Sequence, residues 1–243
     1  MSRASFETFG DLAASGLSDT EKAGRHGIQA ADEKNIVADV AAKLDLRAYD
    51  DLLEIGCGTG NLLIPLSFRV RKAVGIDHPN MIAALEKRFP DPSVSGIAGD
   101  FLELGLDRKF SKILIYSVLH YLSDDAEVLA FLDRAVDLLE PGGRLLVGDL
   151  ANDDRKRRFN ESERGQRFNA EWRAKMENGE PGADAARLFA QMAGDDKRVP
   201  ITDALVLGIL ERYRERGYDA FVLPQPPGLP FCHTREDVLI AHG

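Results

Sequence analysis

Residues 52–60 read Leu52-Leu53-Glu54-Ile55-Gly56-Cys57-Gly58-Thr59-Gly60, and this stretch decides the fold. Its first half is a mostly apolar run of strand length, and the glycines that follow predict a tight turn that leads into a helix. Three glycines at alternate positions carry no side chains that would collide with a ligand lying across the turn. This order of elements is typical of a site where the backbone closely approaches a bound nucleoside.

The residue after this stretch limits which nucleoside fits. A dinucleotide fingerprint requires G-x-G-x-x-G, whereas this sequence reads G-x-G-x-G followed by Asn61. The glycine that would allow close packing of helix and strand is missing from its usual place. Nicotinamide dinucleotide binding is therefore disfavoured.

The bulk composition is that of one α/β domain with additions. The chain has 243 residues, 44% of them hydrophobic, and a formal net charge of −9, which opposes non-specific binding to nucleic acid and to anionic lipid. It has no apolar run of about 18 residues and no basic segment followed by an apolar one at its start, so we expect a cytoplasmic protein without a membrane span. Cys57 and Cys232 show no metal-ligand spacing, and we expect two reduced thiols and no metal.

Strand and helix patterns alternate from residue 50 onward. This alternation predicts a doubly wound, mostly parallel seven-stranded sheet with right-handed crossovers and an antiparallel last strand. Asp124 is expected to cap the longest helix, which should end at Pro141. The predicted strands are 52–55, 73–77, 94–98, 112–117, 144–147, 220–223 and 237–241, and the predicted helices are 31–46, 62–70, 81–85, 124–140 and 203–216.

Two segments differ from this alternation. Residues 1–49 are predicted to form an N-terminal helical arm, and residues 50–243 the main domain. Within the main domain, residues 151–202 are charged and carry helical patterns at 168–176 and 188–192. This helical insertion after the fifth strand, together with the N-terminal arm, is predicted to close over the acceptor as a substrate lid.

Ligands of an open parallel sheet bind outside the carboxyl ends of the strands. That rule selects Asp77, Asp100, Ser117 to His120 and Asp149 in addition to the glycine turn. Asp77 ends the second strand about twenty residues after the turn, at the height of a ribose. Its carboxylate can accept hydrogen bonds from two hydroxyls, each worth roughly 1.5–3 kcal/mol. For Asp77 and Asp100, a role as a helix cap or turn residue is the alternative.

The segment Glu54 to Gly60 matches without a gap the first motif of the class I S-adenosylmethionine-dependent methyltransferases, which is an acidic residue, a hydrophobic residue and G-x-G-x-G. The chain resembles this family over nearly all of the main domain, but not over the arm or the insertion. The resemblance implies a Rossmann-like methyltransferase fold, S-adenosyl-L-methionine as the cofactor and methyl transfer to a small-molecule acceptor.

The resemblance also implies roles for single residues. Asp77 would bind the cofactor ribose and Asp100 the adenine amino group, with Phe101 lining the ring and Met81 packing on it, although spacing alone makes Met81 a core residue. Glu54 would help to organise the loop around the methionyl part, near the ammonium, with a surface position at an edge of the sheet as the alternative. The full predicted cofactor-binding set is Glu54, Gly56, Cys57, Gly58, Gly60, Asp77, His78, Met81, Asp100, Phe101 and Ser117.

Two histidines are the predicted catalytic residues. His120 follows the fourth strand, where a general base competes with a packing or cofactor-contact role. His233 lies with Arg235 in the loop 225–235, which is expected to overhang the ligand edge unless it forms a rigid proline-rich hairpin. His26 in the arm is a further candidate above the pocket.

The acceptor is harder to define. Arg155 to Arg158, Arg164 and Arg167 favour an acceptor with a carboxylate or phosphate, unless they only form a solvated helix face. A catalytically inactive, S-adenosylmethionine-binding partner subunit is the alternative function. Aminopropyl transfer is a third reading, but residues 116–118 lack the acid that a diamine site needs. We expect neither nucleic acid nor membrane as a partner, and the sequence is compatible with a homodimer.

Overall fold

The computed structural model describes residues 6–7, 10–11, 13, 15–22, 33–177, 199–229 and 231–243. Within these ranges a seven-stranded sheet has the strand order β3-β2-β1-β4-β5-β7-β6. Neighbouring strands from β3 to β5 run parallel, whereas β7 is antiparallel to both β5 and β6. The strands are β1 (Asp51–Ile55), β2 (Lys72–Asp77), β3 (Val94–Ala98), β4 (Phe110–Tyr116), β5 (Leu139–Leu150), β6 (Tyr218–Pro224) and β7 (Glu236–His242). The predicted doubly wound, mostly parallel sheet is confirmed.

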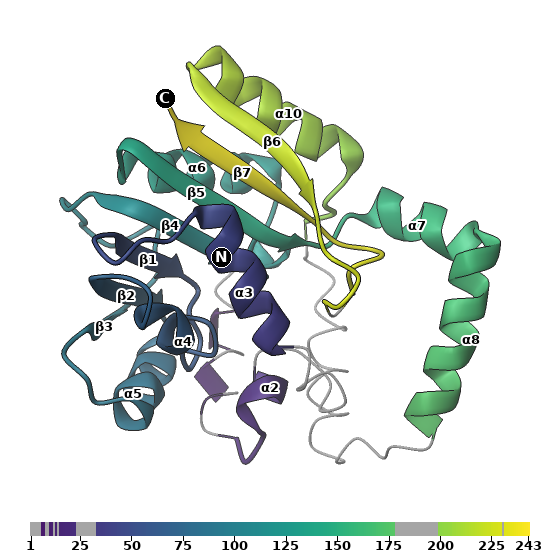
Figure 1. Cartoon of the computed structure of the whole chain (residues 1–243), viewed down its shortest axis with the longest axis horizontal. Coiled ribbons are helices and arrows are strands. Elements are labelled where there is room, and N and C mark those ends of the chain that lie inside the picture. Colours follow the sequence, from purple (N-terminus) through teal and green to yellow (C-terminus); the bar gives the residue numbers. More distant parts are fainter. Residues whose placement is uncertain are drawn as a thin grey trace.

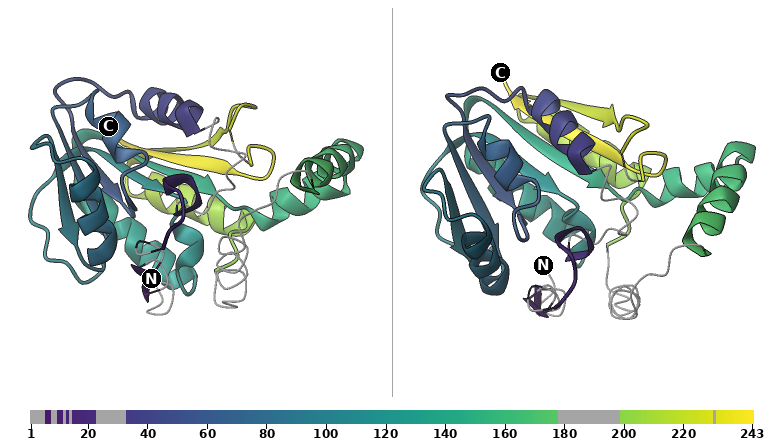
Figure 2. Two further views of the ribbon diagram at one scale, coloured as in Figure 1. Left: turned by 90° about the horizontal axis from the view of Figure 1, so that it is seen from below. Right: turned by 60° about the horizontal axis from the view of Figure 1, so that its bottom comes forward.

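Helices cover both faces of this sheet (Figure 1 and Figure 2). Successive strand side chains point to opposite faces, so Leu53 packs in the core shared with α6 and α10, and Leu52 in the core shared with α3, α4 and α5. The central strands are consequently apolar on both sides. The helices are α3 (Glu33–Leu44), α4 (Leu63–Ser67), α5 (Pro79–Arg88), α6 (Asp125–Asp137) and α10 (Asp203–Glu215), with the 3₁₀ turn η2 (Leu119–Tyr121) after β4.

Three further helices lie outside these layers. The arm contributes α2 (Asp19–Lys22), and the insertion contributes α7 (Asp153–Glu161) and α8 (Glu163–Glu177), which project away from the sheet in Figure 1. The predicted helical pattern at 168–176 lies within α8, whereas 188–192 falls outside the described residues. No helix in the described parts of the chain is both long and apolar enough to cross a membrane.

Asn152 fastens the insertion to the main domain. It is fully buried, and its side chain accepts a hydrogen bond from the Arg155 N–H, which caps α7. Its Nδ2 donates to Asp203 Oδ1 at 2.8 Å and to Glu236 Oε1 at 2.6 Å. One amide side chain therefore joins α7 to α10 and β7.

Two predicted element boundaries were wrong. The cap at Asp124 is confirmed, because its Oδ1 accepts from the Glu127 N–H, but α6 ends at Asp137 and not at Pro141. The Phe110 N–H donates to the Leu138 carbonyl, and Leu139 pairs with Phe110 of β4, ahead of a register shift between Phe110 and Lys112. The chain therefore enters β5 before it reaches Pro141. The helix predicted over 62–70 is also shorter, since only Leu63–Ser67 is helical, around the proline at its centre.

Candidate active site

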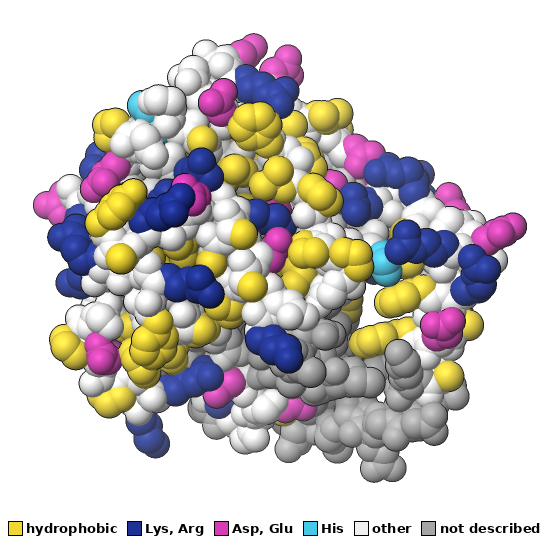
Figure 3. Space-filling model, viewed as in Figure 1, with side chains coloured by type: hydrophobic (Ala, Val, Ile, Leu, Met, Phe, Trp, Pro, Cys, Tyr) yellow, Lys and Arg dark blue, Asp and Glu magenta, His cyan; other side chains and the backbone are white. Residues whose placement is uncertain are grey.

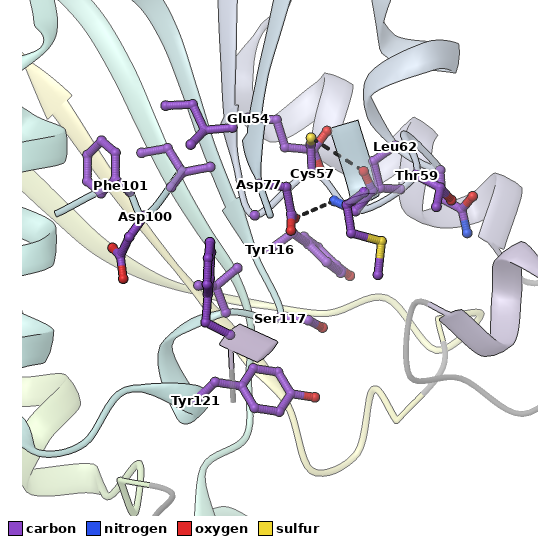
Figure 4. Close-up of a pocket in the computed structure, with 18 of the residues that line it drawn as sticks. Glu54, Cys57, Thr59, Leu62, Asp77, Asp100, Phe101, Tyr116, Ser117 and Tyr121 are labelled. Atoms are coloured by element: carbon purple, nitrogen blue, oxygen red, sulfur yellow. Dashed lines mark hydrogen bonds between the residues drawn. The ribbon is translucent and has the colours of Figure 1, made fainter. Parts of the chain in front are cut away.

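A pocket opens at the carboxyl ends of β1, β2 and β4, at the edge of the sheet where the sequence predicts the ligand (Figure 4). Its empty volume is about 1000 Å³, which includes the space at its open mouth. Nine of the eleven residues predicted to bind the cofactor line it, and Gly60 and His78 do not. The lining residues are Phe6, Lys22, Glu54, Ile55, Gly56, Cys57, Gly58, Thr59, Asn61, Leu62, Ile76, Asp77, Met81, Gly99, Asp100, Phe101, Tyr116, Ser117, Val118, Tyr121 and Phe131.

The glycine turn uses its three glycines in different ways. Gly56 has φ +80°, and a Cβ there would lie 2.4 Å from Val118 Cγ2. Gly58 has φ +53° and lines the pocket, with nothing within 4 Å of where its Cβ would be. Gly60 has φ +87°, and its Cβ would meet Leu85 of α5 at 2.4 Å. Gly60 therefore serves packing and not the pocket wall, unlike its predicted role.

Asp77 connects the end of β2 to the glycine turn. Its Oδ2 accepts from the Gly58 N–H at 2.7 Å and its Oδ1 from the His78 N–H at 2.6 Å. Burial raises the pKa of Asp77, and these two hydrogen bonds act in the opposite direction. Figure 4 shows the carboxylate near the middle of the pocket.

His78, and not Asp77, caps α5. The His78 Nδ1 accepts from the Asn80 N–H at 3.1 Å, so the alternative role considered for Asp77 belongs to its neighbour. The His78 ring packs against Phe6, with ring centroids 4.7 Å apart, and against Gly10, where a Cβ would lie 2.4 Å from the ring. His78 thus contacts the N-terminal arm and lies outside the pocket wall.

One end of the pocket is largely apolar. Phe101 is 4% exposed and packs edge-on against Phe131, with ring centroids 4.9 Å apart, and Met81 is 1% exposed. Asp100 lies at the same end, and its Oδ1 accepts from the Leu102 N–H at 2.9 Å in a turn. This combination of apolar surfaces with one acid suits a flat heterocycle that has a hydrogen-bond donor.

The first strand brings a second acid to the pocket. Glu54 is 3% exposed and lines it beside Cys57. Burial, followed by the charges of Asp77 and Glu54, raises the pKa of the Cys57 thiol well above its usual value, so Cys57 is not a thiolate nucleophile. Cys57 and Cys232 are both buried free thiols, as predicted.

Ser117 and Asp149 form a strained pair at the ends of β4 and β5. Both have positive φ, +59° and +58°, a conformation that costs non-glycine residues of order 1–3 kcal/mol each. The Ser117 hydroxyl donates to Asp149 Oδ2, and the Asp149 N–H donates at 2.9 Å to Asp237 Oδ1 on β7. The Lys43 Nζ in turn lies 2.6 Å from Asp237 Oδ2. These contacts hold the strained pair, and Ser117 lines the pocket.

His120 lies beside the pocket, but it is not among the lining residues. It is half-buried on η2, and its ring centroid lies 4.1 Å from that of Tyr121. Tyr121 lines the pocket in its place. The predicted role of His120 as a general base remains a prediction.

His233 lies apart from the pocket, against the insertion. Its ring stacks on Phe159 at 4.8 Å and meets the edge of Phe168 at 5.0 Å. Its Nδ1 is 3.5 Å from Arg164 Nη2. Burial, and then the positive charges of Arg164 and Arg155, lower the pKa of His233.

We expect His233 to stay neutral as the pH falls below about 6.5, the usual histidine pKa. The unfolded chain would bind the proton first, so this contribution to stability is complete above about pH 6.5 and declines as the pH falls toward the folded pKa. An NMR titration of the His233 ring should give a midpoint below 6.5, and Arg164→Gln should raise it, whereas Arg157→Gln on the outer face of α7 should not. A native midpoint above 6.5 would contradict the assignment.

Several lining residues were missed from the sequence. Thr59, Asn61 and Tyr121 are close in sequence to predicted site residues, so their position beside the motif was an available signal. Phe6 and Lys22 come from the arm, more than thirty residues before the glycine turn, and no local pattern indicates them. His26 lies outside the described residues.

Comparisons with known proteins match the same part of the chain. Residues 52–143 match a family model described as a methyltransferase domain. Over 110 residues the chain is 32% identical to chondramide synthase of Chondromyces crocatus, a match that covers 42% of this chain and 3% of that protein. Over 116 residues it is 28% identical to an uncharacterized methyltransferase of Bacillus mycoides, covering 48% of this chain and 52% of that protein. The chain thus spans about half the length of the Bacillus relative.

Among solved structures, the N-methyltransferase NodS of Bradyrhizobium japonicum in complex with S-adenosyl-L-homocysteine has a TM-score of 0.61. The likeness covers 98% of this chain and 97% of NodS at 18% identity, which shows a shared fold. The family match covers the glycine turn and strands β1 to β4, which carry the predicted site, and it agrees with the predicted family, enzyme class and cofactor. Residues 52–143 therefore form a methyltransferase domain, and the chain has the fold of the class I S-adenosylmethionine-dependent methyltransferases.

Proposed function

We propose that this chain transfers a methyl group from S-adenosyl-L-methionine to a small, anionic acceptor. The observation that carries the proposal is the order of groups along the pocket. Figure 4 shows Asp100 and Phe101 at one end, Thr59 and Leu62 at the other, and Asp77 between them. An adenine, a ribose and a charged amino-acid chain follow one another in the same order in the cofactor.

The chemistry of the lining fits this cofactor. Phe101 and Met81 offer apolar surface to an adenine, and Asp77 offers carboxylate oxygens to two ribose hydroxyls. Glu54, buried at the end of β1, offers a negative charge to the ammonium or sulfonium group. When bound, the cofactor supplies a methyl group already activated on a positively charged sulfur.

A small molecule is the acceptor that this site favours over a nucleic acid. The net charge of −9 disfavours nucleic acid as the acceptor.

Ser117 is suited to orient the acceptor. Its hydroxyl hydrogen is donated to Asp149, so the lone pairs of its oxygen remain able to accept a hydrogen bond from an N–H or O–H in the pocket. Holding a nucleophile in line with the methyl group is the main task of such a site. In this proposal His120 acts as a base only for acceptors that must lose a proton, and His233 contacts an acceptor that reaches the insertion.

Release of S-adenosylhomocysteine on incubation with S-adenosylmethionine and a panel of carboxylate- and phosphate-bearing amines and alcohols tests the proposal. Turnover that is lost in Asp77→Ala supports it. Tight cofactor binding with no turnover on any acceptor would favour the inactive partner subunit instead.

The insertion arginines support an anionic acceptor at one position more than at the others. Arg155 lies 3.5 Å from Glu236, Arg157 lies 2.8 Å from Asp154, and Arg158 pairs with Asp203. These three arginines therefore neutralise acids of the protein itself. Arg164 instead lies beside His233, and Figure 3 shows many positively charged side chains over α7 and α8.

Replacing Arg164 with alanine should raise KM for an anionic acceptor by about 10-fold, the value of one charged hydrogen bond, and leave cofactor affinity unchanged. Steady-state kinetics at saturating S-adenosylmethionine measures the effect. Arg157→Ala, which removes an exposed arginine paired within α7, is the matched control and should leave KM unchanged. An unchanged KM in Arg164→Ala would remove the role of Arg164.

A further inference from the structure

We propose that Lys22, on α2 of the N-terminal arm, binds the carboxylate of the cofactor's methionyl group. This inference rests on the proposed function and adds to the cofactor site a residue from outside the motif-bearing domain. Lys22 lines the same pocket as the glycine turn and Asp77. The sequence instead predicts that the arm covers the acceptor.

The charges of the pocket support a role for Lys22 in binding a carboxylate. Glu54, Asp77 and Asp100 are its acidic lining residues, and Lys22 is the one cation among the lining residues that the structure describes. The cofactor carries an ammonium, a sulfonium and a carboxylate. The first two groups are attracted by the acids, whereas the carboxylate would be repelled by them without a nearby cation. Lys22 provides the positive charge that the carboxylate needs.

The short helix that carries Lys22 is fixed by its own sequence. Ser18 and Glu21 form a reciprocal capping box, because the Ser18 N–H donates to Glu21 Oε2 at 2.9 Å and the Glu21 N–H donates to Ser18 Oγ at 3.3 Å. The Lys22 N–H closes the turn on the Ser18 carbonyl at 2.9 Å. The helix is therefore capped by its own residues.

Asp19 anchors this helix to the glycine turn. The Thr59 hydroxyl donates to Asp19 Oδ1 at 3.2 Å, and the Asn61 side chain donates to the Asp19 carbonyl at 2.8 Å. Arg88 of α5 lies 3.4 Å from Asp19 Oδ2 and donates to Asn61 Oδ1 at 2.6 Å. Residues three apart lie on one face of a helix, so the anchor brings Lys22 to the same turn.

The anchor also determines which part of the ligand Lys22 meets. Thr59 lies at the end of the pocket away from Asp100 and Phe101 (Figure 4). With the adenine at that Asp100 end and the ribose at Asp77, the amino-acid part extends toward Thr59. Both acids of α2 are already engaged, Asp19 by Arg88 and Glu21 by Ser18, and among the described residues Lys22 forms no ion pair.

The test compares two ligands that differ only in the carboxylate, S-adenosylmethionine and decarboxylated S-adenosylmethionine, by calorimetric titration of the whole chain. Lys22→Ala should weaken binding of the first about 10- to 100-fold and change binding of the second less than about 2-fold. Lys22→Arg should retain most of the affinity. Lys34→Ala, an exposed lysine on α3, is the matched control and should bind both ligands as the wild type does.

The outcomes separate this inference from the proposed function. Wild-type protein that binds neither ligand would refute the cofactor site itself. Wild-type binding with no loss in Lys22→Ala, or with an equal loss for both ligands, would overturn the role of Lys22 and leave the site intact. Asp19→Ala supplies a second readout, because releasing the anchor should weaken S-adenosylmethionine binding selectively and add little to the loss in Lys22→Ala.

Discussion

Replacing Asp77 with asparagine should weaken S-adenosylhomocysteine binding by about 100-fold or more. The Asp77 oxygens already accept the N–H groups of Gly58 and His78, and each has a further lone pair for a ribose hydroxyl. Two charge-assisted hydrogen bonds are worth roughly 3–6 kcal/mol together, or about two to four powers of ten in affinity. Asparagine has no charge, and its NH₂ group would face one of the two N–H donors.

Calorimetric titration of both proteins measures this effect. Asp124→Asn makes the same change at the cap of α6, where the carboxylate accepts from the Glu127 N–H away from the pocket, and it should bind as the wild type does. Thermal unfolding of each variant distinguishes lost contacts from lost folding. Equal affinity of wild type and Asp77→Asn would contradict the assignment of Asp77 to the ribose.

Replacing Gly60 with alanine should lower the free energy of unfolding by about 2–6 kcal/mol. Gly60 has φ +87°, and a non-glycine residue held there costs about 1–3 kcal/mol. The new Cβ would lie 2.4 Å from Leu85 Cδ1 and 3.0 Å from Ile64 Cδ1, and overpacking of this kind costs about 1–3 kcal/mol more. Urea unfolding monitored by circular dichroism measures the loss.

Gly58→Ala is the matched change two residues earlier, and it should affect cofactor binding more than stability. Its φ of +53° lies in the left-handed region, where strain is about 1–2 kcal/mol, and its Cβ would enter open space. This variant should fold with a smaller loss of stability, and it should bind the cofactor poorly because Gly58 lines the pocket.

For Gly60→Ala, a protein as stable as the wild type would contradict the expected loss and show that the turn tolerates side chains.

Most of the predicted cofactor-binding residues line the pocket, for a physical reason. In a parallel sheet all strands end at one edge, so locating the strands also located Asp77, Asp100 and Ser117. The absence of a glycine just after Gly60 argued against a dinucleotide cofactor. In the structure Gly60 itself allows the turn to lie close to Leu85 of α5. The motif could show that glycines were needed there, but not which contact each one makes.

The features that the sequence did not predict depend mainly on contacts between distant parts of the chain. Lys22 lines the pocket from a helix that Asp19 anchors to Thr59 and Asn61, about forty residues further along, and no periodicity in the sequence indicates such a contact. His233 was expected at the ligand edge, but stacking on Phe159 and Phe168 holds it against the insertion. The end of α6 was misplaced because Leu138 and Leu139 continue its apolar pattern while already joining the sheet.

A crystal structure of the chain grown with saturating S-adenosylhomocysteine tests the central claim most directly. The predicted result is one nucleoside in the pocket, with its adenine between Met81 and Phe101, its ribose hydroxyls on Asp77 and its carboxylate at Lys22. An empty pocket, or a nucleoside bound elsewhere on the protein, would contradict the account.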